Sequence, residues 1–574
     1  MSQKEQVAEW IVREAAQGWE DLVPDGMPKI LGRLLAQRGI TADKVDGFLR
    51  PKLAELSDPL EIPEMDLAVE RILNAVELGE RVCIYGDYDV DGVSSISILR
   101  TILEAYGLVP SSFIPHRSLE GYGLSEGGLE RCLLENGKPD LLITVDCGTV
   151  SNKAIASLNA RGVDTVVVDH HEMGRNGRPD CVALVNPKAS GDSREYLCAA
   201  GVVFKLAHAL LKTSKIEGFD LKKVLDLVAL ATISDIVPLV DENRLLVRHG
   251  LRLLEHAERP GIQALFELTG TEGRLSSADI GFRVGPRLNA AGRMDQPEQA
   301  LATLMTCCEQ EAKSLANELD GFNRNRQKLE QAIFAEATEM IEELDDAPVI
   351  VVGSRGWHAG VVGIVASRLM RIYHKPAFVI AVDDQGVGKA SGRSISGVSL
   401  VEAIDACRDD LIAGGGHHMA AGLSIHEDKI INFREGFVRF VNETCVGKDL
   451  GPKVHVDAEV SLGELSLDFL SSYELLQPFG SYNPQPVFMA RDVWLTEPPR
   501  RLKNNHLRLF LRQGYDERDA IFFGGGAREL PDPPWDIAFT VDRNVFRGRV
   551  NVQISIQKVR AAENPAEPIE NEGE

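Results

Sequence analysis

Three aspartates at alternate positions are the first residues whose types and spacing point to chemistry. Asp87, Asp89 and Asp91 follow the short apolar segment 81–85. Three neighbouring carboxylates repel one another strongly unless cations neutralise them. An EF-hand calcium loop also uses alternating aspartates, but it needs a preceding helix and a glutamate at its twelfth position, where this chain has Ile98. The pattern therefore predicts a divalent-cation site of another kind.

Further acidic and imidazole groups end later apolar elements in the same way. They are Asp146 after an expected strand at 140–145, His170 and His171 after one at 164–168, and Asp235 at the end of an apolar helix at 221–233. A single aspartate in such a place is usually a helix cap. Four separate placements with a histidine pair favour a shared metal site, because the carboxyl ends of parallel strands meet at one sheet edge.

The ligand types indicate which ions bind there. Mixed carboxylate and imidazole groups suit Mn²⁺ or Mg²⁺ better than Zn²⁺. The number of candidate groups predicts two ions that share a bridging carboxylate. Such a pair activates water and neutralises charge during displacement at a phosphate.

The elements that must position these groups follow a β/α rhythm. Apolar strands at 81–85, 140–145 and 164–168 alternate with helices, which is typical of a buried parallel sheet. A second β/α rhythm runs from 348 to 382. Past residue 453 the apolar period changes to two, as in 506–512, which predicts a small β-barrel.

These patterns predict an α/β protein with several domains, since 574 residues exceed what one core usually serves. We expect a helical lead-in at 1–50, a parallel-sheet catalytic domain at 51–295, connecting helices at 296–346, a smaller α/β domain at 347–447, a β-barrel at 453–560 and a disordered acidic tail at 561–574.

Composition restricts the setting of the protein and argues against a nucleic-acid partner. There are 62 Lys and Arg residues against 86 Asp and Glu residues, a net charge of −24, whereas DNA binding needs local positive charge. Net charge does not report a local groove, so both interpretations stay open. The nine cysteines form no CxxC pair, and neither a signal segment nor an apolar run long enough for a membrane is visible. We expect a cytoplasmic protein.

Four ordered motifs resemble those of the DHH phosphoesterase family. They are Asp87-Tyr88-Asp89-Val90-Asp91-Gly92, Val145-Asp146-Cys147-Gly148, Asp169-His170-His171 and Ser234-Asp235-Ile236-Val237-Pro238-Leu239. The resemblance implies a catalytic centre in which Asp89, Asp91, Asp146, His170 and Asp235 bind the metal ions. Asp87 and His171 would lie at or beside the ions, and Asp146 would be the bridging carboxylate.

Other segments narrow the resemblance to the single-strand-specific DNA exonucleases of that family. They are 114–124, 285–293, 356–368, 390–394 and 414–422. The resemblance implies a DHH domain, a long linking helix, a DHH-associated domain and a C-terminal oligonucleotide-binding (OB) barrel. It implies 5′→3′ digestion of single-stranded DNA in repair and recombination, by a monomer that works with a single-strand-binding protein and a helicase.

By the same resemblance, several residues would bind DNA. Arg117, Ser391 and Arg393 would hold the terminal phosphate; Arg287, Asn289 and Arg293 would approach the backbone; Trp357 and His358 would contact the strand; Gly415 and Gly416 would offer backbone N–H groups, and His417 would reach the scissile phosphate. Surface ion pairs, helix caps, core packing and loop hydrogen bonds are the competing interpretations.

Barrel residues could also bind DNA, namely Arg500, Arg501, Lys503, His506, Arg508, Phe510, Phe546, Arg547 and Arg549. For the aromatic residues among them, packing inside the barrel is the alternative. Two other functions remain open. One is a phosphodiesterase of the same family acting on short oligonucleotides, cyclic dinucleotides or pyrophosphate, and the other is a non-catalytic replication scaffold.

Overall fold

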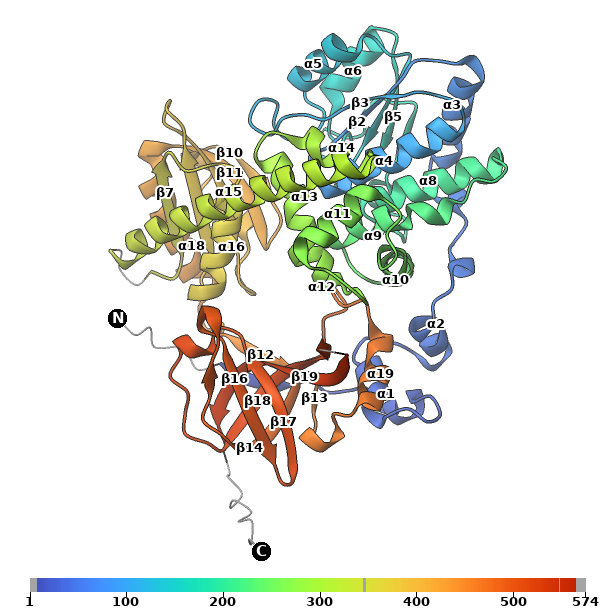
Figure 1. The fold of residues 1–574 in the computed structure, drawn as a ribbon. Helices are drawn as coiled ribbons and strands as arrows, with labels where there is room; N and C mark the ends of the chain where they lie inside the picture. Colours follow the sequence, from blue (N-terminus) through green and yellow to red (C-terminus); the bar gives the residue numbers. More distant parts are fainter. Residues whose placement is uncertain (1–7, 175, 344–346, 547, 564–574) are drawn as a thin grey trace, which may run out of the picture. The chain divides into compact units, whose positions relative to one another are not determined.

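The computed structural model describes residues 8–174, 176–343, 347–546 and 548–563. The chain divides into two compact units (Figure 1). Residues Ser57–Gly451 form the larger unit, and the segment before Ser57 joins the segment from Pro452 onward in the smaller one. Within the described residues, no helix has the length and apolar character needed to cross a membrane.

The catalytic sheet of the larger unit is parallel throughout, as the sequence predicts. Its strand order is β3-β2-β4-β5-β6, with bounds β2 Val82–Gly86, β3 Ser111–Phe113, β4 Leu141–Val145, β5 Asp164–Val168 and β6 Ala183–Val185. Gly86 is paired with Val145, and Val145 with Val168, so these three strands end in register. The residues that follow them therefore emerge at one edge.

Helices complete this part of the larger unit. They are α3 Met65–Leu78, α4 Val90–Ala105, α5 Glu126–Asn136, α6 Asn152–Ala160, α8 Ala199–Thr213, α9 Leu225–Ser234, α10 Asp241–Leu254 and α11 Pro260–Thr269. Helix α4 packs against both α8 and α9. Because α4 begins three residues after Asp87, its burial fixes the first motif against the end of α9, where Asp235 is located.

The expected connecting segment contains two helices. They are α14 Pro297–Met305 and the long α15 Glu309–Glu342. A π-helix at Ile280–Val284 and α13 Gly285–Arg293 precede them. Both α13 and α14 pack against α15.

A second, mixed sheet follows α15, with strand order β10-β11-β9-β8-β7. Its strands are β7 Ile350–Arg355, β8 Ala377–Val382, β9 Val387–Arg393, β10 Leu411–Gly416 and β11 Ala420–His426, and its helices are α16 Val362–Tyr373, α17 Leu400–Ala406 and α18 Ile430–Thr444. Phe378, Phe433 and Phe437 pack together in its core.

The glycine-rich run 414–422 differs from the expected anion-binding loop. It forms the antiparallel hairpin of β10 and β11, in which Gly414 is paired with Leu423 and Gly416 with Ala421. Glycine is needed at position 416 because its φ is +139° and an added Cβ would lie 2.6 Å from the Ala420 carbonyl oxygen. Pairing with β11 occupies only one side of β10, because β10 is the edge strand of this sheet.

The smaller unit contains a seven-stranded sheet with order β13-β14-β18-β19-β17-β16-β15 and an extra β14–β16 pairing. Its bounds are β13 Ala458–Glu459, β14 Phe488–Leu495, β15 Arg500–Arg501, β16 Leu507–Gln513, β17 Asp516–Phe522, β18 Trp535–Phe546 and β19 Arg549–Ala561. Leu507, Leu509 and Leu511 are all buried, as their alternation predicts. The fold class expected from the sequence is confirmed.

The first 50 residues are not simply a helical lead-in to the catalytic domain. Strand β1 Glu9–Val12 pairs in parallel with β12 Lys453–Val456. Helix α1 Lys29–Ala36 buries Leu31, Leu34 and Leu35 in the barrel core. A four-residue strand whose partner lies about 440 residues away has no local sequence signal. The expected disordered tail lies largely outside the described residues, as do residues 344–346 of the connecting segment.

A buried ion pair stabilises the larger unit where the chain enters it. The Lys205 ammonium group is fully buried and lies 2.7 Å from Glu242 Oε2, and it donates to the Ser57 carbonyl oxygen at 2.9 Å. Burial lowers the pKa of Lys205. The charge therefore depends on Glu242 and Ser57 for its stabilisation.

We predict that Lys205→Ala lowers the free energy of unfolding by about 3–5 kcal/mol, because it leaves Glu242 as an uncompensated buried charge. Lys212→Ala on the same helix removes a half-exposed partner of Asp58 and should cost less than about 1 kcal/mol. Urea denaturation followed by circular dichroism compares the two. Equal losses would contradict the role of burial.

Candidate metal centre

The first motif is held in place by the start of α4. Asp89 caps this helix, and its Oδ1 accepts hydrogen bonds from the N–H groups of Asp91 (2.9 Å) and Gly92 (3.2 Å). Only glycine fits at position 92, because an added Cβ would lie 2.3 Å from the Asp87 carbonyl oxygen. The buried Asp91 carboxylate accepts hydrogen bonds of 2.8 Å from the N–H groups of Ala199 and Ala200 at the start of α8. Two helix N-termini therefore orient these aspartates.

Asp146 occupies a strained position directly after β4. Its φ is +60°, in the left-handed region that is uncommon for residues other than glycine. Its buried Oδ1 lies 3.3 Å from His170 Nε2. Strain of this kind persists only where the surrounding structure imposes it, and it is concentrated at functional sites.

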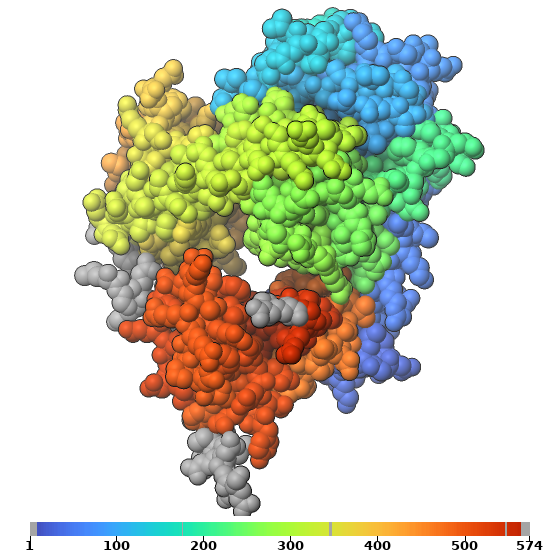
Figure 2. Space-filling model, in the orientation of Figure 1, coloured from blue at the N-terminus to red at the C-terminus, as the bar shows by residue number. Residues whose placement is uncertain are grey.

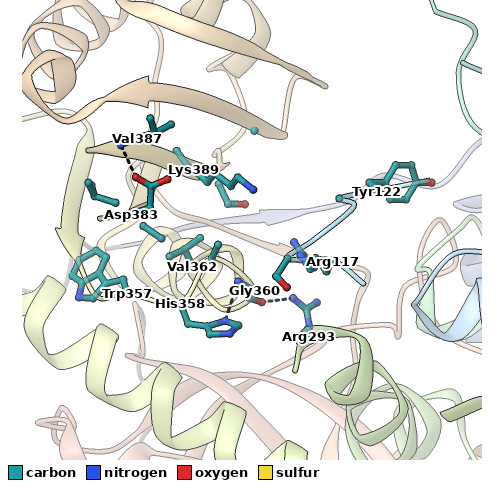
Figure 3. Close-up of a pocket in the computed structure, with 18 of the residues that line it drawn as sticks. Arg117, Tyr122, Arg293, Trp357, His358, Gly360, Val362, Asp383, Val387 and Lys389 are labelled. Atoms are coloured by element: carbon teal, nitrogen blue, oxygen red, sulfur yellow. Dashed lines mark hydrogen bonds between the residues drawn. The ribbon is translucent and has the colours of Figure 1, made fainter. Parts of the chain in front are cut away.

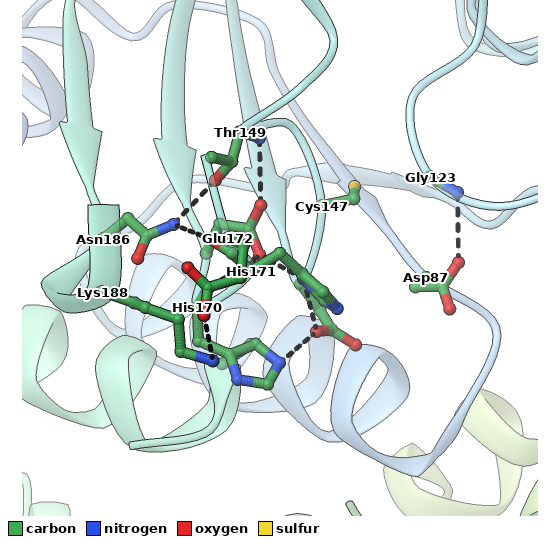
Figure 4. Close-up of polar contacts among 12 residues, drawn as sticks. Asp87, Gly123, Cys147, Thr149, His170, His171, Glu172, Asn186 and Lys188 are labelled. Carbon is green, nitrogen blue, oxygen red and sulfur yellow. Dashed lines mark hydrogen bonds and ion pairs between the residues drawn. The ribbon is translucent and has the colours of Figure 1, made fainter. Parts of the chain in front are cut away.

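Asp169 organises the two histidines that follow it. The buried Asp169 carboxylate accepts hydrogen bonds from the N–H groups of His170 (2.7 Å) and His171 (3.2 Å), and from Thr149 N–H (3.0 Å). Its Oδ1 also lies 2.7 Å from His171 Nδ1. Asn186 donates to the His171 carbonyl oxygen at 2.9 Å (Figure 4). This network fixes the backbone of both histidines and the imidazole ring of His171.

The structure brings the expected ligands together in three overlapping groups. The groups are Asp146, His170 and His171; Asp91, His170 and Asp235; and Asp87, Asp89 and Asp146, with the ligand atoms of each group within 4.8 Å of one another. Asp146 and His170 each belong to two groups. This overlap is the arrangement expected where two ions share ligands.

Two features show that the residues fit divalent cations. Asp87 Oδ2 and Asp146 Oδ1 are buried, and neither has a hydrogen-bond partner among the described residues. Buried carboxylate oxygens without partners are costly unless a cation is coordinated. The oxygen-rich donor set with imidazole suits Mn²⁺ or Mg²⁺.

The pKa values of the site residues also favour the binding of divalent cations. Burial and neighbouring carboxylates raise the pKa of Asp87, Asp146 and Asp235 well above the ordinary range, and they raise the pKa of Asp91 to about 7. Burial lowers the pKa of His170 to about 3, so its imidazole stays neutral. The lone pair that a metal needs is therefore available.

His171 differs from His170 because of its partner. Burial disfavours the charged imidazole, but the hydrogen bond to Asp169 outweighs it and raises the pKa of His171. Its Nε2 lies 2.7 Å from the Tyr122 hydroxyl. Neither Tyr122 nor Asp169 is among the site residues predicted from the sequence, although Asp169 belongs to the same Asp-His-His motif as the two predicted histidines.

A cavity of about 810 Å³ lies beside this centre (Figure 3). Expected DNA-binding residues that line it are Arg117, Arg293, Trp357, His358, Ser391, Arg393 and Gly416. Tyr88, Tyr122 and Lys389 also line it and were not expected. The Arg117 guanidinium lies 5.5 Å from the Tyr88 ring centroid, and Arg393 donates to Ser391 Oγ at 3.2 Å.

Two lining residues also have structural contacts. Arg293 donates to the Gly360 carbonyl oxygen at 2.8 Å, and burial lowers its pKa to about 10, so it remains charged at neutral pH. The largely buried Trp357 donates from Nε1 to Glu336 at 2.7 Å. Trp357 can therefore pack within the protein and still contact a DNA strand in the cavity.

Other expected residues lie in different surroundings. Arg287 pairs with Asp320 of α15 at 2.9 Å, and Asn289 accepts a hydrogen bond from Val90 N–H at the start of α4 at 3.1 Å. Gly415 and His417 are exposed on the β10–β11 hairpin and are not among the described residues that line the cavity. These contacts agree with the alternative interpretations of the two residues: a salt bridge for Arg287 and helix capping for Asn289.

Three family models match the chain, described as the DHH family N-terminal domain (residues 81–232), the DHHA1 domain (346–443) and the RecJ OB domain (456–558). Similar relatives include proteins named single-stranded-DNA-specific exonuclease RecJ. That of Bacillus subtilis is 36% identical, covering 93% of this chain and 68% of the relative. That of Escherichia coli is 31% identical, covering 94% and 96%.

Solved structures agree with these matches. The crystal structure of RecJ from Thermus thermophilus in complex with Mn²⁺ superposes with a TM-score of 0.83 at 29% identity, covering 97% of this chain and 80% of that one. The corresponding complex with Mg²⁺ gives a TM-score of 0.77 at 27% identity, covering 97% and 79%.

We predict that Asp146→Ala abolishes tight Mn²⁺ binding while the protein stays folded, because it removes a carboxylate shared by two of the three groups. Calorimetric titration with Mn²⁺ measures binding, and circular dichroism measures folding. The exposed Asp180 gives a matched control, and Asp180→Ala should bind Mn²⁺ as the unmodified protein does. Unchanged affinity in Asp146→Ala would refute the metal assignment.

We predict a smaller effect for Asp169→Asn, which keeps the shape of the side chain but removes its charge. Weaker orientation of His170 and His171 should reduce Mn²⁺ affinity about 10–100-fold. The same titration tests this. A loss as complete as that of Asp146→Ala would instead indicate that Asp169 itself is a ligand.

Proposed function

The chain belongs to the RecJ family of DHH phosphoesterases, and from that premise we propose that it removes nucleotides from the 5′ end of single-stranded DNA. The protein is a metal-dependent exonuclease that acts on single-stranded DNA, with Mn²⁺ or Mg²⁺ as cofactor. The 5′→3′ direction of digestion and the roles of individual residues are the parts that we propose. One observation carries it: three overlapping ligand groups lie beside a cavity lined with arginines.

In this proposal the metal-binding residues would divide between two ions. Asp87 and Asp89 would hold one ion, Asp91, His170 and Asp235 would hold the other, and Asp146 would contribute to both. When bound, such ions neutralise the charge on the phosphate and activate water. The chain's own contribution is rigidity: helix N-termini fix Asp89 and Asp91, and Asp169 holds a proton between its Oδ1 and His171 Nδ1.

The cavity supplies the second half of the proposal. Arg117, Arg293 and Arg393 offer guanidinium groups, and Ser391 a hydroxyl group, to the terminal 5′ phosphate. Burial disfavours the charged guanidinium and lowers the pKa of Arg393, so a bound anion would compensate a charge that burial leaves poorly solvated. A terminal phosphate held at a fixed distance from the ions would place the first phosphodiester bond at the metal centre. Trp357 and His358 contact the same nucleotide, and the exposed His417 with Gly415 and Gly416 approaches the scissile phosphate.

The barrel of the smaller unit supports binding of a longer strand. The guanidinium groups of Arg500 and Arg508 lie 4.6 Å and 5.1 Å from the Phe510 ring centroid. Lys503 and Arg549 are exposed. Charged groups around an aromatic ring suit phosphates and stacked bases. Arg547 and the Phe546 side chain lie outside the described residues.

The two alternative functions are less well supported. An enzyme restricted to short substrates has no need of an OB barrel, and this chain matches one over residues 456–558. A non-catalytic scaffold would not need to keep every candidate ligand, yet Asp87, Asp89, Asp146, His170 and Asp235 all lie in the ligand groups.

The cellular setting completes the proposal. The enzyme would act in the cytoplasm as a monomer during DNA repair and recombination. A single-strand-binding protein would present the strand, and a helicase would expose it. Co-purification with each protein in the presence of single-stranded DNA tests these contacts.

Digestion of end-labelled DNA tests the main proposal. Single-stranded and duplex oligonucleotides carry the label at the 5′ or the 3′ end, with Mn²⁺, Mg²⁺ or a chelator present. Immediate release of labelled mononucleotides from 5′-labelled single strands, lost on chelation, is expected. Early release from 3′-labelled strands, or equal digestion of duplex, would overturn the proposal.

We predict that Arg393→Met lowers the preference for a 5′ phosphate over a 5′ hydroxyl about 10-fold, because it removes a charge-assisted contact. Ratios of kcat/KM for the two termini measure this preference. Arg355→Met, at an exposed arginine that pairs with Glu427, is the control and should keep the preference. An unchanged ratio in Arg393→Met would remove Arg393 from the phosphate site.

A further inference from the structure

Phe282 is an unusual residue within the larger unit. Its side chain is 81% exposed, although phenylalanine is normally buried. It lies in the π-helix Ile280–Val284, directly before α13. Short π-helical segments are rare and occur frequently at functional sites. An isolated exposed phenylalanine needs no explanation by itself, but the surroundings of this one supply a reason.

Helix α13 runs across the metal centre from one side to the other. At its C-terminal end, Gly292 packs so closely on Tyr88 that an added Cβ would lie 2.4 Å from the Tyr88 carbonyl oxygen, and Arg293 lines the cavity. At its N-terminal end, a Cβ on Gly285 would lie 2.7 Å from Ser234 Oγ, next to Asp235. The helix therefore joins the cavity side to the Asp235 side over about 12 Å.

The direction of the strand follows from this arrangement. A terminal phosphate in the cavity places the first nucleotide on the side of Asp87 and Asp89. Nucleotides on the 3′ side of the cut then leave on the side of Asp235. The π-helix that carries Phe282 packs against α9, and a Cβ on Gly281 would lie 3.6 Å from Ile233 of that helix. Ile236, next to Asp235 in the chain, is 72% exposed and has a strained φ of +61°.

Arg283 directly follows Phe282 in the chain, and Arg287 Nη1 donates a hydrogen bond to the Arg283 carbonyl oxygen at 2.6 Å. Arg283 pairs with Asp279 at 3.4 Å, while Arg287 and Arg324 share the single carboxylate of Asp320. Arg324 remains 65% exposed. Figure 2 shows part of the yellow-green surface of α15 on its visible face. Three arginines against two aspartates leave a locally positive surface in a chain with a net charge of −24.

We propose that Phe282 stacks on a nucleobase on the 3′ side of the scissile phosphate, while Arg283 and Arg324 contact the adjoining phosphates. An exposed ring flanked by arginines is the usual platform for single-stranded nucleic acid. The inference rests on the proposed function, because it presumes that the 5′ end occupies the cavity. Phe282 is a positioning residue: it holds the strand and takes no part in bond cleavage.

Abasic substitution tests the stacking directly. Oligonucleotides with a 5′ phosphate carry one abasic site at the second to the sixth nucleotide in turn. In the unmodified enzyme, one position should raise KM about 10-fold with kcat nearly unchanged. In Phe282→Ala, KM for the intact strand should rise by the same factor and no longer respond to the abasic site at that position. Phe282→Trp should restore the response.

Control measurements separate this inference from folding and from the proposed function. Leu134→Ala removes an 85% exposed side chain from α5 and should leave KM unchanged. Mn²⁺ affinity and the unfolding midpoint should be the same in all variants. If Phe282→Ala and the unmodified enzyme respond equally to every abasic position, the inference fails. If the unmodified enzyme releases no nucleotides, the proposed function fails instead.

Discussion

Repulsion among buried carboxylates is the constraint on which this structure depends. Asp87, Asp91 and Asp146 are buried, and burial together with repulsion from neighbouring carboxylates raises the pKa of each. A protein tolerates this only if cations neutralise the cluster. The in-register strand ends, the helix N-termini and the Asp169 network all hold negative groups where they would otherwise separate. The fold is therefore organised to concentrate charge that a pair of divalent ions balances.

Much of this centre could be predicted because its determinants are local. Each ligand-bearing motif begins within a residue or two of the end of an apolar strand or helix, and parallel strands align their ends. Residues whose roles depend on distant contacts were harder to identify. Tyr122 reaches His171 from a loop, and although it lies in the segment 114–124 that carries part of the resemblance, its residue type and spacing do not indicate a contact with the metal centre. Arg287 occurs in a segment that suggests DNA, but its partner Asp320 lies on another helix.

Outside the metal centre, too, some features of the fold could be predicted from the sequence and others could not. Alternating leucines predicted β16 correctly, whereas the glycine-rich run 414–422 indicated a loop and forms a hairpin. Glycine allows both conformations, so composition alone could not decide between them. The overall charge was also a poor guide to binding. The acidic groups are numerous, but Arg117, Arg293 and Arg393 line one cavity.

The smaller unit is assembled from both ends of the chain, and this has a consequence for biosynthesis. Leu31, Leu34 and Leu35 share a core with Phe488 and Phe539. Roughly 400 residues separate the two segments, which corresponds to about 20–80 s of translation. During that interval the apolar face of α1 emerges from the ribosome without its partner strands. Chaperones that shield nascent chains would therefore be most important for the first 56 residues, long before the catalytic sheet is complete.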